Sequence, residues 1–282
     1  MQNNPYTTLI TAKAQIHAET HGGRAKCLQR LVRLELPVPT TVALSFDAVR
    51  EIAEGHMPDI PAILEQFPAG ALLCVRPSSE DPDWGGPGAV LNIGINDARY
   101  AQLCNRLGHE AGTSIYARFV LGYAVHVARL DPDLFDEVDL DSTDALTRMM
   151  DVYEEETDEP FPQNPGEQLS GVLQSMARAW EGTSARLLRQ AKGAPADAGL
   201  GLVVQQMIPG FGQGECGSGV FQLANIVTGL PQITGRYLSQ SQGREALGAG
   251  AKSIYLEKDD RGISLEEVAP EAFDALKAHA AL

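Results

Sequence analysis

The sequence predicts an α+β protein of two lobes, and three observations lead to this fold class. Segments with helical spacing of apolar residues alternate with short strand-like runs through the first two thirds of the chain. Residues 199–238 are strand-like and interrupted by glycine-rich turns, and a helical segment then closes the chain. We therefore expect an N-terminal lobe with a helical insertion over residues 1–196 and a C-terminal β-rich lobe with a closing helix over residues 197–282.

The bulk composition narrows the classes of partner. The 282 residues carry a formal net charge of −15, and 44% of them are hydrophobic, as in a globular protein. This negative charge repels nucleic acid and anionic membrane surfaces, so neither is expected as a partner, and an anionic ligand would need a local cluster of cations. The chain starts without the basic-then-apolar pattern of a signal peptide and has no apolar run long enough to span a membrane, which predicts a cytoplasmic protein.

The first helix is predicted directly after a pair of glycines. The stretch HGGRAKCLQRL, residues 21–31, places Gly22 and Gly23 before apolar residues at the spacing of one helix face. A glycine turn of this kind lets backbone N–H groups approach a phosphate at the positive end of the helix dipole. On the fragment alone, a plain turn is the more common role of such a pair.

The next elements are a strand, a helix and a second strand. Residues 36–46 have two prolines followed by alternating apolar residues, which predicts a turn that leads into a strand, and FDAVREIAEG then has helical spacing. The stretch ALLCVRPSS, residues 71–79, is typical of a buried strand and brings Arg76 to its end, where ligand groups are often held. The Gly-, Pro- and Asp-rich stretch that follows is expected to be an irregular surface loop.

The middle of the chain is expected to be helical. Residues 98–129 include IYARFVLGYAVHVARL, which is apolar nearly all round, as in a buried helix. Residues 131–159 are strongly acidic, which predicts a solvated surface. The stretch FPQNPGEQLSGVLQSMARAW then predicts an amphipathic helix whose buried face comprises Leu169, Leu173, Met176, Ala177 and Trp180.

The last third of the chain predicts a hairpin and a closing helix. Thr228, Gly229, Leu230 and Pro231 give the turn signal of a hairpin between two strand-like runs. The stretch SLEEVAPEAFDALKAHAAL is predicted to be one helix with its N-terminal cap at Ser264.

Five stretches, in order along the chain, resemble the N-terminal nucleotide-binding domain of the pyruvate phosphate dikinase and phosphoenolpyruvate synthase family. They are GGRAKCLQRLVRLELPVPTTVAL, LLCVRPSS, GGPGAVLNIGIND, FPQNPGEQLSGVLQSMARAW, and LVVQQMIPG with GSGV and YLSQSQG after it. Their order and spacing cover nearly the whole chain. The resemblance implies an ATP-grasp fold, in which two lobes hold ATP in the cleft between them.

The resemblance implies a phosphate site at the start of the chain. Gly22 and Gly23 would cover the phosphates of ATP, and Arg24 and Arg76 would be the catalytic cations that bind them. Phosphoryl transfer depends mainly on positioning and on neutralising charge on the phosphate oxygens, so cations are the residues that it needs. Arginine suits this role because its planar fork makes two parallel bonds to a phosphate.

The resemblance also implies the positions of the base, the metal and the partner. Gln205, Gln206, Met207 and Ile208 would form the strand beside the adenine, and Gln242 would lie near a bound Mg²⁺. In this family the terminal phosphates of ATP load a histidine on a separate domain. A phosphohistidine domain or subunit would therefore be the partner.

The sequence departs from the family at positions that matter for this chemistry. Arg24 replaces the family's lysine, and Glu80 and Ala224 align with arginines of the dikinases. Leu230 replaces the metal-binding glutamate. Mg²⁺ prefers hard oxygen ligands and leucine offers none, which argues against a complete Mg²⁺ site.

Two functions are therefore compatible with the sequence. The first is an ATP-dependent phosphotransferase module that loads a histidine on a separate domain or partner, because no segment of this chain resembles the phosphohistidine motif. The alternative is a degenerate ATP-grasp module with a binding or regulatory role and no phosphoryl transfer. Another acceptor, as in antibiotic-phosphorylating relatives, would need the same histidine domain and is not separable from the first function by sequence.

Overall fold

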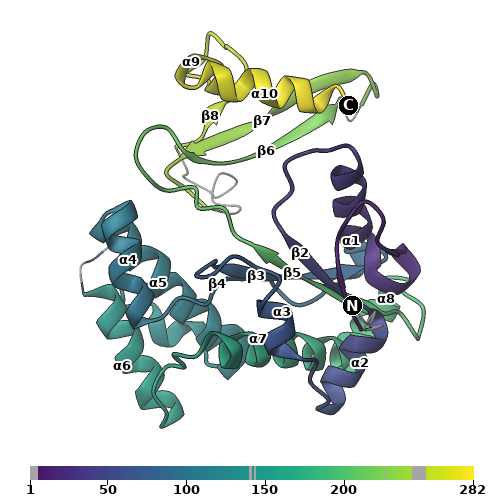
Figure 1. Cartoon of the computed structure of the whole chain (residues 1–282), viewed down its shortest axis with the longest axis vertical. Coiled ribbons are helices and arrows are strands. Elements are labelled where there is room, and N and C mark those ends of the chain that lie inside the picture. The colour runs from purple at the N-terminus through teal and green to yellow at the C-terminus, as the bar shows by residue number, and fades with distance from the viewer. Residues whose placement is uncertain (1–5, 140–141, 143, 226, 243–251) are drawn as a thin grey trace. The chain divides into compact units, whose positions relative to one another are not determined.

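The computed structural model describes residues 6–139, 142, 144–225, 227–242 and 252–282 (Figure 1). These residues form a mixture of helices and sheets, which confirms the predicted α+β class. The chain divides into two compact units, one of Met1–Asn105 and His109–Met207, the other of Arg106–Gly108 and Ile208–Leu282. Gly243, the last residue of the stretch YLSQSQG, lies outside the described residues.

The first unit is built on a five-stranded sheet in the order β1-β2-β5-β3-β4, in which all neighbouring strands are antiparallel. Its strands are β1 (Thr7–Leu9), β2 (Thr41–Leu44), β3 (Leu73–Ser79), β4 (Val90–Ile93) and β5 (Leu200–Gln206). Because β5 pairs with both β2 and β3, it belongs to the first unit. The boundary between the two compact units lies between Met207 and Ile208, whereas the sequence predicts a lobe boundary between residues 196 and 197.

Alternation of side chains gives this sheet two different faces. On one face, Val203 of β5 shares a core cluster with Ala25 of α1 (Ala18–Arg33), so α1 covers that face. The other face packs against α7 (Pro165–Glu181), whose Trp180 approaches Pro77 of β3 around Gly86. The buried face predicted for α7 is confirmed, because none of its five predicted residues is more than 2% exposed.

The segment between β2 and β5 contains further helices. They are α2 (Phe46–Glu54), α3 (Ile60–Leu64), α4 (Asp97–Leu107), α5 (His109–Tyr123), α6 (Ala145–Thr157) and α8 (Thr183–Ala191), with single turns at Pro82–Trp84, Ala124–Ala128 and Pro132–Phe135. The predicted burial of α5 is confirmed, and Tyr123 lies in an aromatic cluster with Tyr153 of α6 and Phe161, at ring-centroid distances of 5.2 to 6.4 Å. Among the described helices, none has the length and apolar character needed to cross a membrane.

The second unit contains a three-stranded sheet and two helices. Its strands are β6 (Gly217–Ala224), β7 (Pro231–Ser239) and β8 (Ile254–Tyr255), and β6 and β7 form the predicted hairpin. Ser264 caps the closing segment as predicted, with the Glu267 carboxylate accepting from its main-chain N–H at 3.1 Å. The single closing helix predicted there is wrong. The chain instead forms α9 (Leu265–Val268) and α10 (Pro270–Ala280), because Pro270 disfavours helical geometry in the residue before it.

Candidate functional site

The predicted glycine turn is a break within α1. Gly22 has φ 82° and ψ 166°, a conformation that essentially only glycine adopts, and helical geometry resumes after it. A Cβ on Gly22 would overlap the main-chain oxygen of Ser78 in β3. Glycine is therefore required here by the close approach of α1 to β3, whether or not a phosphate binds nearby.

Ser78 also caps the helix that follows the break. Its Oγ accepts a hydrogen bond from the main-chain N–H of Ala25 at 3.0 Å, and so satisfies one of the donors left open at a helix start. Sequence reasoning missed this residue, because the contact joins positions 53 residues apart and leaves no local signal.

A row of polar side chains lies on the face of the sheet that α1 covers. Arg76 pairs with Val203 and Cys74 pairs with Gln205, so strand alternation puts Cys74, Arg76 and Gln205 on the α1 face. Gln205 Nε2 donates to Thr41 Oγ1 of β2 at 2.9 Å, which extends the row to a third strand. Arg76 stands in the middle of β3 and not at its end as predicted, because pairing with β5 continues to Ser79.

Arg24 and Arg76 both act electrostatically on the Cys74 thiol. Burial raises the pKa of the Cys74 thiol, while the charges of Arg76 and Arg24 and a backbone hydrogen bond from Gln205 act in the opposite direction. Both guanidinium groups are therefore within electrostatic reach of one sulfur atom. Arg76 is only partly exposed, and within the described residues no acceptor lies within hydrogen-bond distance of its guanidinium.

The residues predicted beside the adenine run out of β5 into the second unit. Gln206 ends the strand, and the main-chain N–H of Met207 donates to the Leu72 oxygen at 2.8 Å. Met207 Sδ also accepts from the main-chain N–H of Asn92 at 3.0 Å, whereas Ile208, the first residue of the second unit, is 63% exposed. The base-binding role of these residues stays a prediction.

The second unit holds the predicted metal ligand and two of the departures from the family. Gln242 is buried, and Ala224 and Leu230 lie on the exposed β6–β7 hairpin. Residues 217–242, which include the hairpin and Gln242, contain no aspartate or glutamate. A metal at Gln242 would therefore receive no carboxylate from this segment, and its role as a metal ligand stays a prediction.

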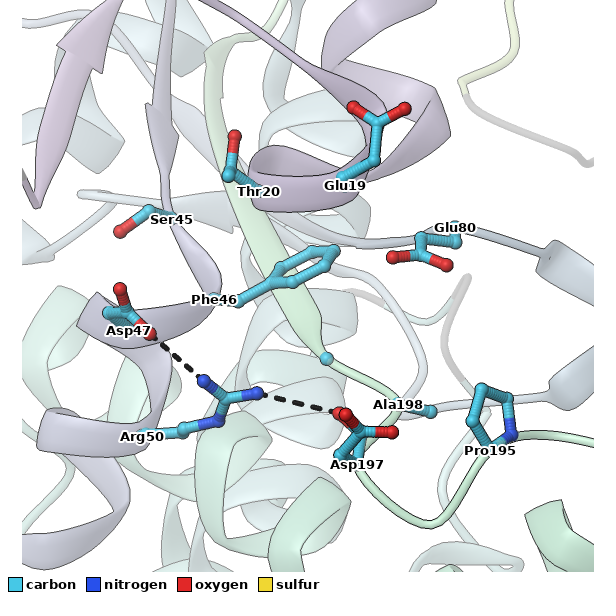
Figure 2. Close-up of a pocket in the computed structure, with 11 residues that line it drawn as sticks. Glu19, Thr20, Ser45, Phe46, Asp47, Arg50, Glu80, Pro195, Asp197 and Ala198 are labelled. Atoms are coloured by element: carbon cyan, nitrogen blue, oxygen red, sulfur yellow. Dashed lines mark hydrogen bonds and ion pairs between the residues drawn. The ribbon is translucent and has the colours of Figure 1, made fainter.

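Figure 2 shows a pocket of about 200 Å³ in the first unit, next to the start of α2. It is lined by the carboxylates of Glu19, Asp47, Glu80 and Asp197, while its guanidinium, that of Arg50, is paired with Asp47 at 2.9 Å. This excess of negative charge disfavours a phosphate. None of the described residues predicted for the phosphate site lines this pocket.

Comparison with known proteins finds pyruvate, phosphate dikinases. The chain is 28% identical to the enzyme of Rhizobium meliloti (strain 1021) over 299 residues, which covers 89% of this chain and 33% of that protein. It is 25% identical to a chloroplastic pyruvate, phosphate dikinase of Flaveria trinervia over 90% of this chain and 30% of the relative. The Clostridium symbiosum enzyme is 28% identical over 64% of this chain and 23% of its own length.

The similarity covers one part of each relative. The chain spans about a third of the length of the first two curated relatives named above. No family model matches the chain.

Proposed function

We propose that this chain, a member of the pyruvate, phosphate dikinase-like family, binds ATP with an ATP-grasp fold and supplies its phosphoryl group to a histidine on a separate domain or subunit. The observation that carries the proposal is the guanidinium of Arg76, which lies partly buried on the α1 face of the sheet without an acceptor among the described residues. The similarity to the dikinases over about nine tenths of the chain supports the same assignment.

The charges on the α1 face suit a polyphosphate. Both arginines act electrostatically on the Cys74 thiol, and a phosphate bound near that thiol would be attracted by both charges. Arg76 can offer two parallel N–H groups to one phosphate. Since phosphoryl transfer needs mainly charge neutralisation and positioning, these cations would act on the transferred group directly.

A second candidate function is ATP binding without transfer. It is favoured by the absence of any carboxylate between residues 217 and 242, where Leu230 aligns with the family's metal-binding glutamate. Mg²⁺ bound there would be held by Gln242 and by the phosphates of the nucleotide, and would supply charge neutralisation for transfer. A weakly held metal would leave binding intact and slow transfer.

Calorimetric titration of the full chain with ATP, with and without Mg²⁺, tests the proposal. We expect saturable binding that weakens at least about tenfold in Arg76→Ala, because one charge-assisted hydrogen bond contributes about 1.5 to 3 kcal/mol. Arg30→Ala is the control, since Arg30 is an exposed arginine on α1, the helix that covers the Arg76 face of the sheet. Equal affinities of the two variants would remove Arg76 from the site, and no binding by the unmodified chain would overturn the proposal.

Transfer is tested separately from binding. Radiolabelled ATP is incubated with the chain and a purified phosphohistidine domain, and label on the histidine domain is measured. Label that depends on Arg76 and Mg²⁺ supports the phosphotransferase. ATP binding that is indifferent to Mg²⁺, with no label on the acceptor, supports the second candidate.

A further inference from the structure

Arg189 of α8 is a buried cation, and two of its guanidinium nitrogens have no hydrogen-bond acceptor among the described residues. Its side chain is stacked 3.6 Å above the Trp180 ring, and the residue is 5% exposed. Nη1 donates to the main-chain oxygen of Trp180 at 2.7 Å. Within the described residues, no acceptor reaches Nε or Nη2, and no carboxylate forms an ion pair with the guanidinium. A buried charge is costly unless it is paired, so an anion bound next to the Arg189 guanidinium would be stabilising.

Arg189 lines a cavity of about 390 Å³ in the first unit. The walls come from the end of α7, from α8, from α2 and from the segment before β5, and are formed by Arg50, Glu181, Arg186, Arg189, Ala196, Asp197 and Ala198. Trp180 Nε1 donates to the Ala198 main-chain oxygen at 3.0 Å, which fixes that segment against the ring under Arg189. The guanidinium is therefore held in place before any ligand arrives.

Two further arginines line the cavity. Arg186 is exposed, and its Nη2 donates to the Glu181 main-chain oxygen at 3.1 Å without an ion pair among the described residues. Arg50 pairs with Asp47 at 2.9 Å and also donates to the main-chain oxygen of Asp197 (Figure 2). Arg186 therefore adds more unneutralised positive charge to the cavity than Arg50 does.

Two carboxylates oppose this charge. Glu181 and Asp197 line the same cavity, but neither forms an ion pair with Arg186 or Arg189 within the described part of the chain. Burial lowers the pKa of Arg189 even though the Glu181 charge acts in the opposite direction. The nearby carboxylates thus leave the charge of Arg189 under-compensated.

We infer that this cavity binds a small phosphate-type oxyanion at Nη2 of Arg189. Nη2 is the unpaired donor of this guanidinium that keeps accessible surface, and a charge-assisted hydrogen bond from it to a phosphate oxygen is a strong contact. Arg186 adds a second cation on the same helix, and Asp197 weakens the attraction. The site shares no residue with the polar face around Arg76, so it does not depend on the proposed function.

Titration with inorganic phosphate at constant ionic strength tests this site in the full chain. Arg76→Ala serves as the background, because Arg76 is itself proposed to bind phosphate. We expect a saturable rise of the unfolding temperature and calorimetric binding, both lost in Arg189→Gln. Arg186→Gln should weaken phosphate binding about tenfold, whereas Asp197→Asn should strengthen it. Because both residues are exposed, these two variants test the site even if Arg189→Gln fails to fold. Arg178→Gln, an exposed arginine on α7, is the control.

The test depends on opposite changes in phosphate affinity in Arg186→Gln and Asp197→Asn. Weaker binding in Arg186→Gln with tighter binding in Asp197→Asn supports the site. No saturable phosphate effect in the Arg76→Ala background, or an equal loss in Arg178→Gln, overturns it. Failure of this titration leaves ATP binding at Arg76 untouched, and failure of ATP binding leaves this site untouched.

Discussion

Gly22 of α1 and Ser78 of β3 lie so close that a Cβ on Gly22 would overlap the Ser78 main-chain oxygen. Gly22 also has a positive φ of 82° with ψ 166°. We expect Gly22→Ala to lower the free energy of unfolding by about 3 kcal/mol or more, since backbone strain and steric overlap add. Chemical denaturation of the two proteins measures the loss.

Gly70→Ala is the control for this change. Gly70 has φ 79°, but a Cβ there would meet nothing within 4 Å, so this variant reports backbone strain without overlap. Its loss should be about 1 to 2 kcal/mol. Equal losses at the two positions would show that the contact with Ser78 contributes nothing.

Asn92 predicts a stabilising substitution. It has φ 63° and is 3% exposed, and within the described residues its Oδ1 has no hydrogen-bond donor. Asn92→Gly removes both the strained conformation and the unsatisfied acceptor, so the free energy of unfolding should rise by about 1 kcal/mol. Asp158→Gly, at an exposed residue with φ 56°, should change it little. A loss of stability in Asn92→Gly would mean that its side-chain packing outweighs both gains.

His21 predicts a dependence of stability on pH. The residue is 7% exposed, and burial followed by the charge of His17 lowers its pKa. The unfolded chain, whose histidine pKa is about 6.5, therefore takes up a proton at higher pH than the folded protein. Stability is fully present above that value and falls as the pH drops through it, by up to about 1.4 kcal/mol per pH unit for one proton.

Urea denaturation between about pH 7.5 and 5.5 measures this dependence. His21→Gln should flatten it, and His279→Gln, at an exposed position, should not. Identical pH profiles for the unmodified chain and His21→Gln would contradict the assignment to His21.

The sequence predicted those parts of the fold that depend on neighbouring residues. The buried face of α7, from Leu169 to Trp180, is a local periodicity, and the β6–β7 hairpin has its turn residues in the chain itself. The assignment of β5 to the first unit could not be predicted from neighbouring residues. Its composition resembles that of the segment that follows, while its partner strands β2 and β3 lie more than a hundred residues earlier. Pro270 is a local signal that divides the closing segment into α9 and α10.

The candidate site also contains residues that could be assigned from local sequence and residues whose position depends on tertiary structure. Arg76 could be assigned to a buried strand, but its position opposite Val203 follows from strand pairing that the sequence does not show. Nothing in the sequence around Arg189 indicates that this residue is buried. It lies in an amphipathic segment where arginine is usually solvated, whereas here it is 5% exposed and stacked on Trp180.

Leu230 predicts a gain of metal-dependent binding. It is 65% exposed in the turn of the β6–β7 hairpin, and its hydrogen bonds with Asn225 and Thr228 are made by its main-chain atoms, so Leu230→Glu should leave stability almost unchanged. Glutamate at this position would give the segment from 217 to 242 its first carboxylate, the ligand type that Mg²⁺ prefers. We expect calorimetric ATP affinity to rise about tenfold with Mg²⁺ and not without it. Val227→Glu adds the same charge to the same turn at an 87% exposed residue and should give no gain. An equal gain in both variants would mean that general electrostatics, and not a ligand at position 230, attracts the metal.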